Sequence, residues 1–117
     1  MSMNLTGRAT EFFVKVGNRA VLTITIVDAS NVKKSLQDNI TYATGKWKVW
    51  KPDGTLIING TLVFEDRPNG IVSYRLAASD VVIANAGIWE GEVEIFDGDG
   101  DMSEQTKTFN FTIEESY

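Results

Sequence analysis

The stretch Ile88–Phe96, which reads IWEGEVEIF, decides the fold class of this chain. Two sets of residues alternate along it, the apolar or small Trp89, Gly91, Val93 and Ile95 and the charged Glu90, Glu92 and Glu94. Successive side chains of a strand point to opposite faces, so this alternation predicts a β-strand with one buried face. The three glutamates form a line of like charge. Such a line must be solvated, matched by a neighbouring strand, or offered to a binding partner.

Other segments of the chain show the same period-two pattern. In Ala20–Asp28, the residues Leu22, Ile24 and Ile26 alternate with valine and threonine, and β-branched residues of this kind favour strands. Further strands are predicted over Glu11–Val16, Lys46–Lys51, Thr55–Ile58, Thr61–Glu65, Ile71–Leu76 and Glu104–Ile113.

Turn signals separate these segments. Pro52–Gly54 combines a proline that presets φ with a glycine that accepts positive φ. Asn59–Gly60 is the preferred two-residue hairpin sequence and predicts a hairpin at that point. Arg67–Gly70 and Asp97–Asp101 are predicted as further turns.

Two segments lack a strand pattern. Ser79 and Asp80 resemble a helix start, and a single helical turn is expected there, ending near Gly87. Ala29–Thr44 is the longest candidate loop, and its Val32–Leu36 portion fits either a helical turn or an extended crossing.

Seven or eight short strands, turns at intervals of roughly 8–12 residues and almost no helix favour a sandwich or a barrel. We predict an all-β fold, an immunoglobulin-like antiparallel β-sandwich with one short helical turn. Only the architecture is meant, because the paired cysteines of immunoglobulin domains are absent. The length of 117 residues predicts one domain over 1–117, with its core at about 11–113.

Composition restricts the chemistry that is expected. The chain has no cysteine and no histidine, so disulfides, thiolate metal sites and the usual neutral-pH general base are excluded. An enzyme would depend on carboxylates, lysine, tyrosine or serine, and no pair of carboxylates has a spacing that singles it out for acid–base work. We therefore expect no enzymatic activity and no cofactor.

The charge is unevenly distributed. The net charge is −5, and residues 80–117 hold ten acidic side chains but one basic residue, Lys107. A strongly negative half argues against nucleic acid as a partner, because phosphates must be neutralised by lysine and arginine. No apolar stretch has the length of a signal peptide or a membrane span, so no membrane association is expected.

The glutamate line has two interpretations. It could be a surface that binds a partner, or its charges could be paired with lysines on an adjacent strand. In an immunoglobulin-like strand order, Lys46–Lys51 and Ile88–Phe96 are antiparallel neighbours, which would set Lys46 and Lys48 beside the glutamates. Such opposite-charge pairs contribute roughly 0.2–1 kcal/mol each, and we favour this interpretation.

The acidic run Asp97, Asp99 and Asp101 resembles the first half of a calcium loop. A complete loop of that type needs glycine at its sixth position and glutamate at its twelfth, where this chain has Met102 and Thr108. A weaker calcium site that also uses Glu104 is left open, but a flexible acidic hairpin turn is the favoured interpretation. The three aspartates are kept as candidates for contact with a partner.

Three tryptophans could form a stacking platform for a sugar. Trp47 and Trp89 have the parity of core residues, whereas Trp50 has outward parity and is the best candidate for contact with a ligand or partner. A tryptophan covered by lysine stems is the alternative for Trp50.

The order of signals from Trp47 onward resembles a known family. A strand runs into Pro52–Gly54. It is followed by the sequence GIVSYRL at Gly70–Leu76 and by a short turn at Ser79. After these come GIWEGEVEI at Gly87–Ile95 and a closing strand that ends with TFNFTI at Ile113. This order is similar to the N-terminal domain of phage baseplate upper proteins, the BppU type, over about Phe13 to Ile113. The chain departs from that pattern in the longer and more polar Ala29–Thr44 segment.

The resemblance implies a non-enzymatic structural module of the virion, in the tail baseplate of a phage or prophage and assembled in the cytoplasm of the bacterial host. Its implied partners are other baseplate or tail proteins, and it would help to mount receptor-binding proteins; a homo-oligomer is left open. The alternative is a carbohydrate-binding or adhesin-like β-sandwich module, which would use Trp50 and the acidic turn. The family has no docking motif that could be transferred to this chain.

Overall fold

The computed structural model describes residues 4–7, 11–28, 30, 32–106 and 109–115. These residues form ten strands and two short 3-10 helices. The strands are β1 (Asn4–Gly7), β2 (Glu11–Lys15), β3 (Val21–Val27), β4 (Thr44–Trp50), β5 (Leu56–Thr61), β6 (Val63–Asp66), β7 (Ile71–Arg75), β8 (Gly87–Phe96), β9 (Met102–Thr106) and β10 (Phe109–Glu114). The 3-10 helices are η1 (Arg67–Asn69) and η2 (Ile83–Asn85).

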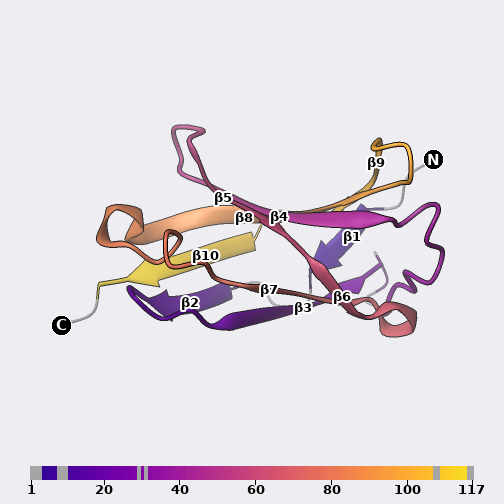
Figure 1. The fold of residues 1–117 in the computed structure, drawn as a ribbon, viewed down its shortest axis with the longest axis horizontal. Helices are drawn as coiled ribbons and strands as arrows, with labels where there is room; N and C mark the ends of the chain where they lie inside the picture. Colours follow the sequence, from indigo (N-terminus) through magenta and orange to yellow (C-terminus); the bar gives the residue numbers. More distant parts are fainter. Residues whose placement is uncertain (1–3, 8–10, 29, 31, 107–108, 116–117) are drawn as a thin grey trace.

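The strands lie in two layers (Figure 1). In the first layer β8 is the central strand: β4 pairs with one edge of it, and β10 and β9 pair with successive halves of its other edge. β5 extends this layer beyond β4, and β2 runs parallel to β10. In the second layer β7 lies between β3 and β6, antiparallel to both. β1 pairs with β9 and with β3 and so links the two layers.

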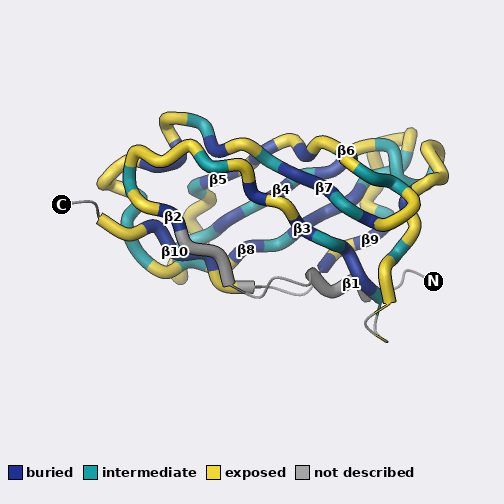
Figure 2. Tube along the Cα trace, turned by 90° about the horizontal axis from the view of Figure 1, so that it is seen from below, coloured by how far each residue is buried: buried dark blue, intermediate teal, exposed yellow. Residues whose placement is uncertain are grey.

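The core lies between the layers, and in Figure 2 the buried positions recur along the strands while most of the turns at both ends are exposed. Every second residue of a strand points into this core. In β3 these residues are Leu22, Ile24 and Ile26, which are buried, as predicted. Trp47 is fully buried, and its ring centroid is 4.9 Å from that of Phe111 in an edge-on contact. The predicted core parity of Trp47 is therefore confirmed. Trp89 is half-buried against the same cluster, and its indole nitrogen donates to the Asn85 carbonyl at 2.7 Å.

The predicted hairpin at Asn59–Gly60 is wrong. Both residues lie inside β5, which pairs with β4 up to Thr61. The chain then crosses to the other layer at the buried Leu62 and continues as β6. Gly60 is buried beneath the ring of Tyr74, where a Cβ atom would collide with that ring. The glycine is thus required by packing and not by a turn.

The described residues of the Ala29–Thr44 segment contain no helix, and residues 39–41 form a single turn closed by a hydrogen bond from the Tyr42 nitrogen to the Asp38 carbonyl at 2.8 Å. The Val32–Leu36 portion of the segment is an extended crossing, in which Lys33 forms an isolated bridge with Val27 and Leu36 is fully buried. The Arg67 guanidinium donates to the Leu36 and Tyr42 carbonyls at 3.0 and 2.8 Å. The Asp38 carboxylate caps the turn at residues 39–41, and its hydrogen bonds with Thr41 lower the pKa of this carboxyl group.

The strand count exceeds the predicted seven or eight for two reasons. The predicted closing strand Glu104–Ile113 is present as two strands, β9 and β10, and β1 was not predicted. Phe111 and Ile113 of β10 are buried in the core, whereas the side chain of Phe109 lies outside the described residues. A short helical turn occurs at η2, close to the predicted place. Among the described residues there is no helix that could cross a membrane.

Candidate functional site

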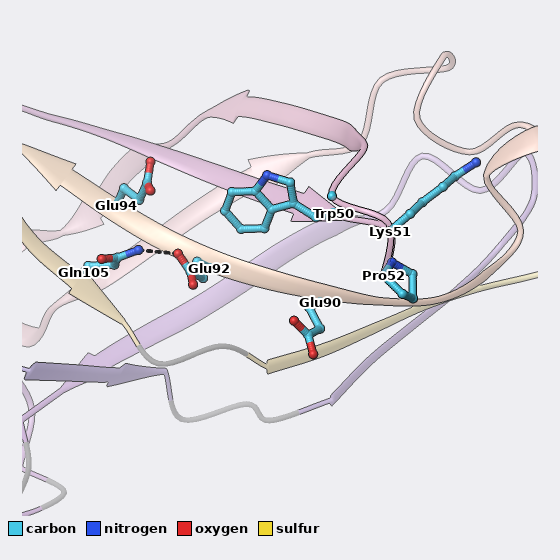
Figure 3. Close-up of a pocket in the computed structure, with 8 residues that line it drawn as sticks. Trp50, Lys51, Pro52, Glu90, Glu92, Glu94 and Gln105 are labelled. Carbon is cyan, nitrogen blue, oxygen red and sulfur yellow. Dashed lines mark hydrogen bonds between the residues drawn. The ribbon is translucent and has the colours of Figure 1, made fainter.

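A surface groove lies on the outer face of β4, β8 and β9, and we call it the Trp50 groove. Its volume is about 490 Å³. One wall comes from the end of β4 and the hairpin that follows, and the other from the outward residues of β8 and β9. The lining residues are Trp50, Lys51, Pro52 and Gly54 on one side and Glu90, Glu92, Glu94 and Gln105 on the other (Figure 3).

Trp50 reaches the groove because of strand parity and a tight turn. Trp47 and Val49 face the core, so Trp50 points outward, directly opposite Glu90 of β8. The hairpin after it is closed by the Asp53 carboxylate, which accepts from the Thr55 backbone at 2.9 Å. Hydrogen bonding with Thr55 also lowers the pKa of Asp53. The outward parity of Trp50 agrees with the sequence, while its role in binding stays a prediction.

The predicted pairing of β4 with β8 is confirmed, with Lys46 opposite Glu94 and Lys48 opposite Glu92. The two lysine side chains, however, do not contact the glutamates that lie directly opposite them in this register. Lys48 forms its salt bridge diagonally with Glu94, at 2.7 Å, and Lys46 donates to the hydroxyl of Thr61. Lys48 therefore neutralises Glu94, the buried end of the glutamate line.

The other two glutamates have different surroundings. Glu92 accepts a hydrogen bond from the amide of Gln105, and Glu90 is exposed beside Trp50. Within the described residues, neither forms a salt bridge. The ammonium of Lys51 lies 5.4 Å from the centre of the Trp89 ring, and Figure 3 shows this side chain extending away from the glutamates. The groove thus combines an indole with two carboxylates, those of Glu90 and Glu92, that form no salt bridge with a cation in the described residues.

The acidic turn lies elsewhere. Asp97 accepts from the backbone nitrogens of Asp99 and Asp101 at 2.9 and 3.0 Å, so its carboxylate closes the turn between β8 and β9. Glu104 is buried and lies opposite Ile95 on the inner face. In the described part of the chain, no three acidic side chains come together as a metal site.

Trp50 and this turn are at opposite ends of the β4–β8 pair, because Thr44 lies opposite Phe96 and Trp50 opposite Glu90. Six residues of strand separate these ends, which corresponds to roughly 20 Å. The predicted candidates therefore do not form one site. Gln105 was missed as a groove residue, because only the β8–β9 register places it beside Glu94.

A partly buried polar pair, Tyr74 with Asp80, was also missed by sequence reasoning. The hydroxyl of Tyr74 donates to the Asp80 carboxylate at 2.6 Å, and the same oxygen accepts from the Ala77 backbone at 2.7 Å. Burial, followed by this hydrogen bond, raises the pKa of Tyr74 to about 12. The inward parity of Tyr74 was the available signal, but the partner depends on how the loop after β7 folds back. The pair fastens that loop to the core beside Gly60.

The fold and the groove define an immunoglobulin-like β-sandwich domain with an acidic and aromatic outer face. The model of the BppU N-terminal domain family matches residues 4–117, and the chain therefore belongs to this family. The predicted resemblance is thus confirmed, and the chain is a domain of the phage baseplate type.

Comparison with solved structures agrees with the β-sandwich fold. The N-terminal domain of phage TP901-1 ORF48 is similar with a TM-score of 0.70 and 13% identity, over 96% of this chain and 95% of that one. A Salmonella alpha-2-macroglobulin reacted with methylamine is similar with a TM-score of 0.54 and 19% identity, over 100% of this chain and 6% of that one. At these identities the likeness concerns the fold alone. None of the curated proteins compared with the chain matches it.

Proposed function

We propose that the chain is a non-enzymatic structural module of a phage or prophage tail, which docks to other baseplate proteins and helps to mount receptor-binding proteins. The observation that carries the proposal is the family match over residues 4–117. Its counterpart in phage TP901-1 ORF48 has the same extent, since the similarity covers 95% of that domain. The module acts in the virion baseplate after assembly in the host cytoplasm.

The surface chemistry supports docking and not turnover. The described titratable residues with shifted pKa values, Asp38, Asp53 and Tyr74, are each explained by a turn or by loop packing. The Trp50 groove is open to solvent, and one of its walls carries an indole ring. Aromatic residues are enriched where proteins meet.

The test uses co-purification. The tagged chain is expressed together with each tail protein encoded by the same phage or prophage, and complexes are identified by size-exclusion chromatography and mass spectrometry. A stable complex with a baseplate protein is expected, and tails that lack this domain should lose their receptor-binding proteins in electron micrographs. Complete baseplates without the domain, or turnover of a glycan or peptide that depends on one of its carboxylates, would contradict the proposal.

The alternative, a carbohydrate-binding or adhesin-like module, has less support. It was motivated by Trp50 acting together with the acidic turn, and these lie at opposite ends of the β4–β8 pair. What still favours it is the outward position of Trp50 in a groove with polar walls. A broad glycan array tests it, because specific binding that Trp50→Ala abolishes would support this function.

A further inference from the structure

We infer that the Trp50 groove is the docking site for an arginine side chain presented by a protein partner. The inference rests on the proposed docking function and assigns it a surface and a chemistry. It starts from the two groups the groove leaves available, the face of the Trp50 indole and the carboxylates of Glu90 and Glu92.

The first argument is charge. Lys48 is engaged with Glu94 at 2.7 Å, Lys46 with Thr61, and the Lys51 ammonium lies over Trp89. The cations nearest the groove are therefore directed to other groups. Glu90 and Glu92 are left as negative charges on an open surface, which a cation from a partner would complement.

The second argument is the balance of donors and acceptors. The amide nitrogen of Gln105 already donates to Glu92, so the polar groups that remain open in the groove are mainly carboxylate oxygens, which only accept. A guanidinium has five N–H donors and no acceptor, and it pairs with carboxylates through two parallel bonds. A sugar hydroxyl both donates and accepts, and the groove offers it few donors.

The third argument is the indole. Figure 3 shows the Trp50 ring next to β8, with the side chains of Glu90, Glu92 and Glu94 around it. A guanidinium is planar and stacks on such a ring while its edge reaches a carboxylate, a combination that a compact ammonium does not reproduce. The occupant is therefore arginine in preference to lysine.

The experiment follows the indole N–H signal of Trp50 in the nitrogen-15-labelled chain, assigned by its loss in Trp50→Phe. The probes are blocked Gly-Ser-Arg-Ser-Gly and the same peptide with citrulline, which keeps the shape but lacks the charge. We expect a saturable shift with the arginine peptide that weakens as salt is added, and at least fivefold weaker binding of the citrulline peptide.

The matched variants each remove two negative charges. Glu90→Gln with Glu92→Gln should weaken the arginine peptide at least fivefold, whereas Asp99→Asn with Asp101→Asn, at the other end of β8, should leave it unchanged. The inference would be overturned if both peptides bound equally well or if both double variants had equal effects. It would also be overturned if N-acetylglucosamine or glucose, and not the arginine peptide, shifted the Trp50 signal.

The docking function is tested separately. If the chain co-purifies with a baseplate protein and the Glu90→Gln, Glu92→Gln variant does so equally well, the groove assignment is wrong and the docking function stands. If no baseplate protein binds while the arginine peptide does, the docking function is wrong although the groove recognises guanidinium.

Discussion

At the scale of single residues, Gly60 shows that a glycine in a typical turn sequence can be required for close packing inside a strand. It was predicted to form a turn, but it lies within β5 under the Tyr74 ring. Gly60→Ala should destabilise the domain by about 1–3 kcal/mol, the usual cost of forcing extra volume into a packed site. Urea unfolding measures this. Gly98→Ala is the control, since its nearest new neighbour would be the Ile40 carbonyl oxygen at 3.7 Å, and equal costs would contradict the packing argument.

Tyr74 predicts a dependence of stability on pH. Its pKa is raised from 10.0 to about 12 in the folded chain, mainly by burial. The folded state thus favours the neutral phenol, and this contribution is complete below about pH 10 and is lost as the pH rises through 12. Melting temperatures from pH 8 to 12 should fall more steeply for the wild type than for Tyr74→Phe. Lysines titrate in both proteins, so the difference between the curves isolates Tyr74, and parallel curves would refute the assignment.

At the scale of elements, the β4–β8 pair was the most predictable part of the molecule. Alternation defined both strands and their inward faces, and the opposite charges indicated their pairing. Alternation does not define rotamers, however, so the diagonal Lys48–Glu94 bridge and the Gln105 contact of Glu92 came only from the structure. Alternation predicted the outward positions of Trp50 and of the three glutamates in the Trp50 groove, whereas Gln105 could not be predicted because its place depends on the register of β8 with β9.

This pairing can be measured by a double-mutant cycle. Lys48→Met and Glu94→Gln should each destabilise the domain, and their coupling energy should be about 1 kcal/mol, because the Glu94 side chain is almost fully buried. Glu92→Lys should also destabilise it, because it places a like charge opposite Lys48. Chemical denaturation of the single and double variants gives the coupling, and a value near zero would show that the bridge contributes nothing.

The loop before β4 could not be predicted because its order comes from a distant residue. Arg67 donates to the Leu36 and Tyr42 carbonyls and lies 4.0 Å from the centre of the Phe64 ring. Arg67→Met should remove both hydrogen bonds and speed amide exchange in residues 36–43, with a loss of about 1–3 kcal/mol. The exposed Arg75→Met is the control. Hydrogen exchange that is unchanged in the Arg67 variant would show that the loop is ordered by Leu36 burial alone.

At the scale of the whole molecule, the acidic C-terminal third is concentrated in one layer, because β8, β9 and β10 are neighbours there. Neighbouring strands lie about 5 Å apart, which is less than the Debye length of about 8 Å at physiological salt, so the negative charges of this layer act together on a nearby partner. A partner with a basic surface should therefore be attracted before contact. All the acidic residues of this layer contribute to the long-range attraction, whereas the inferred recognition of arginine depends only on the residues of the Trp50 groove.

The two contributions can be separated by kinetics with a baseplate protein that co-purifies with the chain. Raising the salt from 50 to 500 mM should slow association by about tenfold or more, because long-range attraction acts on the association rate. Asp99→Asn with Asp101→Asn should reduce this salt dependence and leave the dissociation rate unchanged. Glu90→Gln with Glu92→Gln should in addition speed dissociation, because these residues contact the partner directly. Surface plasmon resonance measures both rates, and an association rate that is indifferent to salt would show that the acidic layer does not steer docking.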